Sequence, residues 1–159
     1  MTIKVGDKLP AAKLFTMKEG RPAPVTTDDL FKGKKVVVFA VPGAFTPTCS
    51  QAHLPGFVVN ADAIKSKGVD SIVCLSVNDA FVMGAWGKGA NAEELVMVGD
   101  GNGEFTKAVG LEMDGSGFGL GARSQRYAMV VDNGVVKVLN VEAPGKFEVS
   151  SAEAILKAL

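Results

Sequence analysis

A thiol at the end of the run Val41-Pro-Gly-Ala-Phe-Thr-Pro-Thr-Cys49 has the clearest chemical potential in this sequence. The run follows a continuous apolar stretch, residues 36–41, which predicts a strand covered on both faces. A Pro-Gly break ends that strand, and Cys49 then stands at the start of a predicted helix. Backbone N–H groups at a helix N-terminus are unpaired and carry partial positive charge, so they favour an anion. Because cysteine attacks as the thiolate, this position favours a reactive nucleophile.

Three neighbours of Cys49 have types that suit this chemistry. Pro42 restricts the backbone and is expected to shield the thiol from water. Thr46 lies three residues before the cysteine, so its hydroxyl either caps the helix or points at the atom that the sulfur attacks. Thr48 supplies a backbone N–H directly before the cysteine.

A thiolate also needs a cation, because a helix terminus contributes only about 0.3–1 kcal/mol at exposed sites. The one tight arginine cluster in the sequence, Arg123-Ser-Gln-Arg126, lies beside a predicted strand. Arg126 is the candidate, since its forked guanidinium can contact two atoms at once. An arginine before a strand is more often a solvated surface residue, so composition alone leaves Arg126 a minority choice. His53 lies one helical turn after Cys49 and could tune the thiol, but we favour the alternative that it is a partly exposed residue that bonds backbone or water.

The remaining cysteine, Cys74, lies within the apolar run 72–77 and is predicted to be a small buried hydrophobic residue. The chain has no C-x-x-C pair, and a tetrahedral zinc site is implausible with two cysteines and one histidine.

Length and composition indicate one domain over residues 1–159. Seventeen basic and seventeen acidic residues cancel, which gives no electrostatic reason to expect nucleic acid or an anionic membrane as a partner. The N-terminus lacks the apolar stretch of a signal peptide, and no run approaches a membrane span. We therefore expect a soluble cytoplasmic protein.

Strands and helices alternate along the chain. An N-terminal hairpin includes residues 13–17, and residues 27–31 fit one capped helical turn. The remaining strands are predicted at 72–77, 95–98, 126–131 and 135–141, with an Asn-Gly turn between the last two. The remaining helices are predicted at 49–66 with a kink or restart near Pro55, from Asn78 or Asp79 to 88, at 104–109, and after Ser150 or Ser151; residues 115–122 are predicted to be a loop. This order predicts an α/β fold, a central mixed sheet flanked by helices with an N-terminal hairpin extension, and it is thioredoxin-like.

Together these motifs resemble a type II (peroxiredoxin-5-like) peroxiredoxin. The segments that carry the resemblance are 41–50, with its P-x-x-x-T-x-x-C element, 53–57, 76–79, 123–128 and 150–152. The resemblance covers essentially the whole chain. It implies a decorated thioredoxin fold and reduction of hydrogen peroxide and alkyl hydroperoxides, with no metal and no bound prosthetic group.

Carried over residue by residue, the resemblance makes Cys49 the peroxidatic nucleophile, which emerges as a sulfenic acid. The Thr46 hydroxyl and the N–H groups of Thr48 and Cys49 would bind the peroxide oxygens. Arg126 would stabilise the thiolate and the charge on the leaving oxygen, and Pro42 would wall the pocket.

The resemblance also bears on how the enzyme is restored. Some family members carry a resolving cysteine in the segment that corresponds to 149–151, where this chain has Val-Ser-Ser. Cys74 matches the second cysteine of plant-like members, but we expect it to be buried and too distant for ready pairing. The expected reductant is external, either glutaredoxin with glutathione or thioredoxin, and a homodimer packed near the active-site face is implied.

Two rival functions make different demands on the sequence. A thiol-disulfide oxidoreductase on the same fold would need a C-x-x-C pair, and Cys49 has none. A redox-sensing or chaperone-like protein would use Cys49 as a switch and react once with peroxide, whereas a peroxidase turns over.

Overall fold

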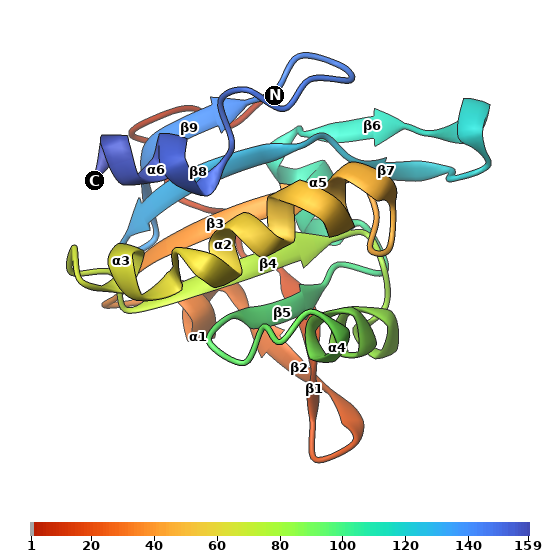
Figure 1. The fold of residues 1–159 in the computed structure, drawn as a ribbon, viewed down its shortest axis with the longest axis horizontal. Coiled ribbons are helices and arrows are strands. Elements are labelled where there is room, and N and C mark those ends of the chain that lie inside the picture. Colours follow the sequence, from red (N-terminus) through yellow and green to blue (C-terminus); the bar gives the residue numbers. More distant parts are fainter. Residues whose placement is uncertain (1) are drawn as a thin grey trace.

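Seven strands form one mixed sheet in the computed structural model, which describes residues 2–159 (Figure 1). Its strand order is β2-β1-β5-β4-β3-β8-β9. The central strands β3, β4 and β5 are parallel, whereas β8, β9, β1 and β2 add antiparallel pairs at the two sides. The bounds are β1 Lys13–Lys18, β2 Arg21–Thr26, β3 Lys35–Val41, β4 Ser71–Ser76, β5 Val96–Gly99, β8 Tyr127–Asp132 and β9 Val135–Val141.

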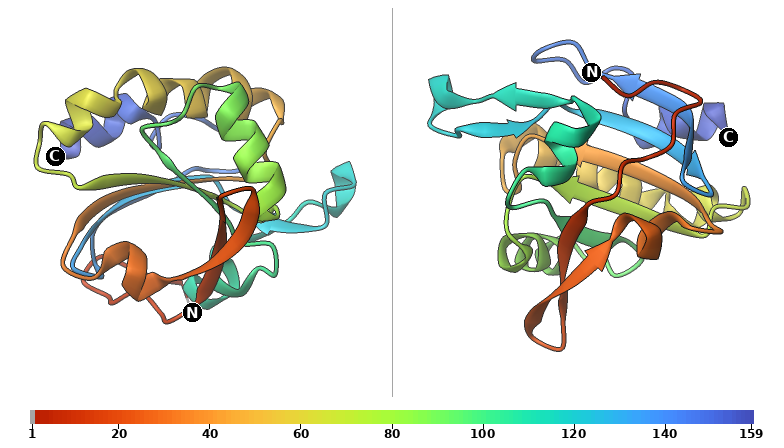
Figure 2. Two further views of the ribbon diagram at one scale, coloured as in Figure 1. Left: turned by 90° about the horizontal axis from the view of Figure 1, so that it is seen from below. Right: turned by 180° about the vertical axis from the view of Figure 1, so that it is seen from behind.

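Helices cover both faces of this sheet, as the sequence predicted (Figure 2). The helices α2 (Leu54–Val59), α3 (Ala61–Lys65), α4 (Ala80–Gly89) and α6 (Ala152–Ala158) pack on one face. The opposite face holds α1 (Thr27–Phe31) and α5 (Glu104–Val109). Alternate residues of β3 enter the two cores, with Phe39 on the first face and Val38 on the second. Because both faces are covered, the strand has the continuous apolar run seen in the sequence.

The helical segment after β3 is irregular at two points. It contains a π-helical turn, η1 (Cys49–His53), in which the N–H of Leu54 donates to the carbonyl of Cys49. At Pro55, where a kink or restart was predicted, the helical backbone continues but changes from the π-helical turn to α2, which begins at Leu54 with the proline in its first turn. A break at Asn60 was not predicted.

The loop predicted at residues 115–122 is confirmed for 115–121, which connect the two strands of a small hairpin, and Ala122 begins the second of these strands. The strands β6 (Glu112–Asp114) and β7 (Ala122–Ser124) pair antiparallel around a 3₁₀ turn, η2 (Ser116–Phe118). The hairpin projects from the body of the molecule beside the loop that follows β3 (Figure 1).

Asp79 caps α4 and Ser151 caps α6, each by accepting a backbone N–H three residues on. The sequence left Asn78 or Asp79 as the first cap and Ser150 or Ser151 as the second, and the structure shows the later residue of each pair in that position. Within the described residues, no helix has the length and apolar character needed to cross a bilayer.

Candidate active site

The loop between β3 and η1 presents two unpaired amides beside the thiol. The first helical backbone bond runs from the N–H of Ser50 to the carbonyl of Thr46, at 2.9 Å. Pro47 has no N–H, and the amides of Thr48 and Cys49 have no protein acceptor within residues 2–159. These two N–H groups are therefore available to an oxygen atom next to the sulfur.

Thr46 does not cap the helix with its side chain. Its hydroxyl donates to the carbonyl of Gly43 at 2.7 Å, inside the loop. The hydroxyl proton is thereby committed, and the lone pairs of Oγ1 are left to accept a hydrogen bond. Of the two roles that the sequence left open, the geometry favours the one directed at the attacked molecule.

The loop is held from outside by Arg123. Its Nη1 donates to the carbonyl of Pro42 at 3.1 Å and its Nε to the carbonyl of Leu120 at 3.0 Å. A Cβ on Gly43 would lie 2.7 Å from this guanidinium, so a larger residue there would have to displace Arg123. Arg123 thus ties the β6–β7 hairpin to the thiol loop.

The guanidinium of Arg126 lies against the sulfur of Cys49. Its Nη2 is 3.1 Å from Sγ, although the residues are 77 positions apart in sequence. The sheet explains the contact: β8 runs antiparallel to β3 with Tyr127 opposite Ala40, so the residue before β8 meets the residues after β3. A fixed positive charge at this distance stabilises a thiolate relative to a neutral thiol.

The second arm of the fork bonds His53. Nη1 of Arg126 is 2.8 Å from Nδ1 of the imidazole, and Nε2 is 2.8 Å from the carbonyl of Ser150. Arginine can only donate, so Nδ1 accepts and the proton is on Nε2, which donates to Ser150. Burial, together with the charge of Arg126, lowers the pKa of His53 to about 3, so the ring is neutral.

The expectation that His53 is partly exposed was wrong, because its side chain is completely buried. The π-helical turn places the imidazole on the same side as the thiol, between Phe39, Phe57 and Phe147. The spacing of one turn from Cys49 was the available signal, but the burial of His53 also depends on rings from β3 and from the loop after β9, which are distant in sequence.

Glu142, which sequence reasoning missed, fastens the loop that contains Ser150. Its buried carboxylate accepts the N–H groups of Glu148, Val149 and Ser150 and the Ser150 hydroxyl, at 2.7 to 2.9 Å. Desolvation acts to raise the pKa of Glu142, but these hydrogen bonds outweigh it and hold the pKa below its ordinary value. Four of the five partner bonds come from backbone N–H groups, which have no residue-type signature in the sequence.

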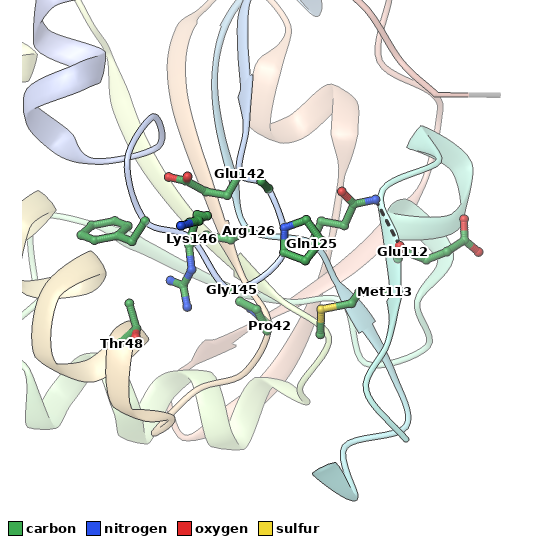
Figure 3. Close-up of a pocket in the computed structure, with 12 residues that line it drawn as sticks. Pro42, Thr48, Glu112, Met113, Gln125, Arg126, Glu142, Gly145 and Lys146 are labelled. Carbon is green, nitrogen blue, oxygen red and sulfur yellow. Dashed lines mark hydrogen bonds between the residues drawn. The ribbon is translucent and has the colours of Figure 1, made fainter. Parts of the chain in front are cut away.

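A cavity of about 410 Å³ opens beside the arginine. Figure 3 shows Pro42 and Thr48 reaching it from the loop after β3, Gln125 and Arg126 from the segment before β8, and Lys146 from the loop after β9. Cys49 is fully buried and lies behind this lining, in contact with Arg126. Pro42 forms part of the cavity wall, and its shielding of the thiol stays a prediction.

Cys74 is buried, as predicted. It lies in β4, opposite Phe39 of β3 and Met97 of β5 in the strand register. Both cysteines are free thiols. Burial raises the pKa of the Cys74 thiol, and the nearby Cys49 raises it further. Since the thiolate is the nucleophile, Cys74 is inert in this conformation. Within the part of the chain that is described, no three His, Cys, Asp or Glu residues are grouped so that they could hold a metal ion.

Comparisons with known proteins agree with this geometry. The Redoxin family model matches residues 4–156. Peroxiredoxin-2E-2, chloroplastic, from Oryza sativa subsp. japonica is 56% identical over 99% of this chain and 73% of the relative. The crystal structure of reduced Prx3 in complex with H₂O₂ from Vibrio vulnificus is 61% identical, with a TM-score of 0.96 over 99% of both chains. Peroxiredoxin 5 from Alvinella pompejana is 36% identical, with a TM-score of 0.86 over 98% of this chain and 97% of that one.

The chain therefore belongs to the Redoxin family, and within it to the type II, peroxiredoxin-5-like peroxiredoxins. It is a thiol-dependent peroxidase with a thioredoxin-like fold, as the resemblance implied.

The neutral, buried histidine predicts an acid-sensitive fold. The unfolded chain protonates His53 below its ordinary pKa of 6.5, whereas the folded chain does not until about 3. The unfolded state thus binds more protons, and the free energy of unfolding falls with decreasing pH by a slope that approaches about 1.4 kcal/mol per unit. Urea unfolding between pH 7.5 and 5, followed by the single tryptophan, measures this slope.

A Cys49→Ser background removes thiol ionisation from the comparison. In that background, adding His53→Gln should flatten the slope, because the chain has no other histidine. Equal slopes with and without His53 would contradict the assignment of a neutral ring.

Proposed function

We propose that Cys49 is the peroxidatic nucleophile and that Arg126, Thr46 and the amides of Thr48 and Cys49 form its peroxide-binding site. The contact of 3.1 Å between Nη2 of Arg126 and Sγ is the observation that carries this proposal. It joins the thiol to a fixed cation at the wall of a cavity that can admit a hydroperoxide.

In the proposed reaction, the Cys49 thiolate attacks the terminal oxygen of the hydroperoxide, the one that carries the hydrogen. An S–O bond forms as the O–O bond breaks, the sulfur is oxidised to a sulfenic acid, and the peroxide is reduced to an alkoxide, or to hydroxide from H₂O₂. The leaving oxygen takes a proton from water and departs as an alcohol or water. Negative charge moves from sulfur to the leaving oxygen, so donors already in place stabilise the transition state without reorganisation.

Each donor has a geometric role in this step. Arg126 lies beside the sulfur and can bond the attacked oxygen as the thiolate charge is consumed. The unpaired amides of Thr48 and Cys49 donate hydrogen bonds to that oxygen from the helix end, and Oγ1 of Thr46 accepts a hydrogen bond from the bound peroxide.

We infer that an external thiol restores Cys49, with glutaredoxin and glutathione or thioredoxin as the candidate reductants. The first reductant thiol displaces water from the sulfenic acid to give a mixed disulfide, and a second thiol releases the reduced enzyme. The burial of Cys74 supports an external reductant, as does the Val-Ser-Ser sequence at 149–151. The cytoplasmic location that we expect from the sequence stays a prediction.

We also propose a homodimer that packs at the active-site end. Three exposed phenylalanines lie on segments grouped there: Phe45 after β3, Phe81 at the start of α4 and Phe118 in the β6–β7 turn, which are 61%, 60% and 88% exposed. Figure 1 shows these segments at one end of the sheet. Exposed aromatic residues of this kind favour association.

Replacing Arg126 tests the proposed chemistry. Arg126→Lys keeps the charge but cannot contact Sγ and Nδ1 of His53 together, so the rate constant for peroxide reduction should fall about 100-fold or more. Peroxide consumption measures it, with Cys49→Ser as the inactive reference and Arg21→Lys, on the exposed edge of the N-terminal hairpin, as the matched control. A rate within about threefold of wild type would remove Arg126 from the mechanism.

Regeneration is tested by steady-state turnover with the thioredoxin system and the glutaredoxin–glutathione system in parallel. We expect turnover with at least one of them, and no change on Cys74→Ser. A Cys74→Ser variant that kept its first oxidation step but lost turnover would show that Cys74 resolves the sulfenic acid.

The dimer is tested by sedimentation of the reduced protein. Phe118→Ser should raise the dimer dissociation constant, because it removes an aromatic side chain from the proposed interface. Val59→Ser is the control, since Val59 is 82% exposed on α2 and outside that interface. A monomeric wild type, or equal effects of the two substitutions, would argue against this interface.

A further inference from the structure

A continuous series of hydrogen bonds connects the buried carboxylate of Glu142 to the sulfur of Cys49. Glu142 holds Ser150, Ser150 accepts from His53, His53 accepts from Arg126, and Arg126 contacts Cys49. A second link is direct, since the N–H of Glu142 donates to the carbonyl of Arg126 at 2.9 Å. One residue therefore bonds the arginine's backbone and orders the loop that supports its side chain.

Glu142 has no cationic partner to explain its burial. It is 6% exposed, and neither of the ion pairs found among residues 2–159 involves it. Its charge is instead met by donors from residues 148–150, which close the chain between β9 and α6 into a compact loop. Placing a carboxylate here is costly unless every oxygen is bonded, so the arrangement serves to order this loop.

The ordered loop matters to the site because of where it places one carbonyl. The Ser150 oxygen is the only acceptor that the described structure gives Nε2 of His53, and it therefore keeps the ring proton on that nitrogen. With the proton there, Nδ1 presents a lone pair to Arg126. If the carbonyl moved away, the proton could transfer to Nδ1, where its N–H would face the guanidinium N–H groups and displace them.

The same loop also holds Phe147 against both partners. Its ring centroid is 4.9 Å from that of His53 and 5.8 Å from the guanidinium carbon of Arg126. Loosening the loop would thus remove an aromatic contact from the arginine as well as the bond that selects the histidine tautomer.

We propose that Glu142 is a positioning residue for the peroxidatic site: by fastening residues 148–150 it selects the His53 tautomer that aims Arg126 at the Cys49 sulfur. This inference rests on the proposed function of Cys49 and Arg126.

Glu142→Gln in the full chain is the test. Oε2 of Glu142 accepts four of the five loop bonds and Oε1 accepts one, from the Glu148 N–H. In Glu142→Gln an amide NH₂ would face that N–H, and a neutral oxygen would accept the other four bonds in place of a charged one, so the loop is held less firmly. The second-order rate constant for Cys49 oxidation by H₂O₂ should fall about 10- to 100-fold, as expected for a displaced arginine. The pH at which half of Cys49 is alkylated by iodoacetamide should rise.

A spectroscopic signature separates positioning from a merely structural role. The chain has one histidine, so ¹⁵N NMR of the imidazole reports His53 alone. The wild type should show the neutral tautomer protonated at Nε2, and Glu142→Gln should show a changed or mixed tautomer while circular dichroism shows a folded protein.

Glu148→Gln is the matched control. It makes the same chemical change in the same loop, but the Glu148 side chain is exposed and only its backbone N–H bonds Glu142. Its rate, alkylation midpoint and histidine spectrum should match the wild type. Ser150→Ala removes only the hydroxyl bond and keeps the carbonyl, so a smaller shift in the same direction is expected, and this variant serves if Glu142→Gln fails to fold.

The inference is overturned if Glu142→Gln, or Ser150→Ala in its place, lowers stability but leaves the rate, the alkylation midpoint and the histidine spectrum as in Glu148→Gln. Arg126→Lys distinguishes this result from a failure of the proposed function. If Arg126→Lys is slow and Glu142→Gln is fast, only the positioning role fails, whereas a fast Arg126→Lys removes the basis of both proposals.

Discussion

The forked guanidinium of Arg126 is the constraint on which the rest of this site depends. One nitrogen faces the Cys49 sulfur at 3.1 Å and the other faces His53 at 2.8 Å. A lysine could not satisfy two partners in fixed directions, because it presents one compact charge on a flexible stem. The surrounding structure keeps this cation directed at the sulfur without neutralising it.

The choice of histidine as the second partner follows from that requirement. A carboxylate bonded to Arg126 would compete with the thiolate for the same positive charge. A neutral imidazole supplies a lone pair that orients the guanidinium and leaves its charge for the sulfur and the incoming oxygen. Burial keeps the ring neutral by lowering the pKa of His53 to about 3. The nearby carboxylate, Glu142, directs its oxygens to backbone N–H groups and the Ser150 hydroxyl instead.

The backbone around Cys49 serves the same end. Pro47 starts the helix without an N–H, so the next two amides remain free beside the sulfur. The wider turn of η1 then brings Cys49 and His53 to one side, where a single arginine reaches both. π-helical turns of this kind are frequent at functional sites, where they re-aim side chains at the cost of regular helical bonding.

Local patterns in the sequence determined much of this protein. The apolar run of β3, the Pro-Gly break and the thiol after it are encoded within residues 35–49, so the strand-to-helix turn that presents the thiol could be predicted from composition and spacing. The Asn-Gly hairpin and the Asp and Ser caps are equally local, because a turn or cap needs only its own few residues. The family resemblance assigned Arg126, which its composition alone left a minority candidate.

Only the tertiary structure decided what surrounds the arginine. Arg126 meets Cys49 because β8 is registered antiparallel to β3, and His53 is buried because aromatic rings from three segments enclose it. Glu142 acts through backbone N–H groups six to eight residues away, and any residue but proline can supply such a group. Residue types can reveal which atoms are reactive, but sheet register and burial decide which of them meet, because both depend on the whole packed chain.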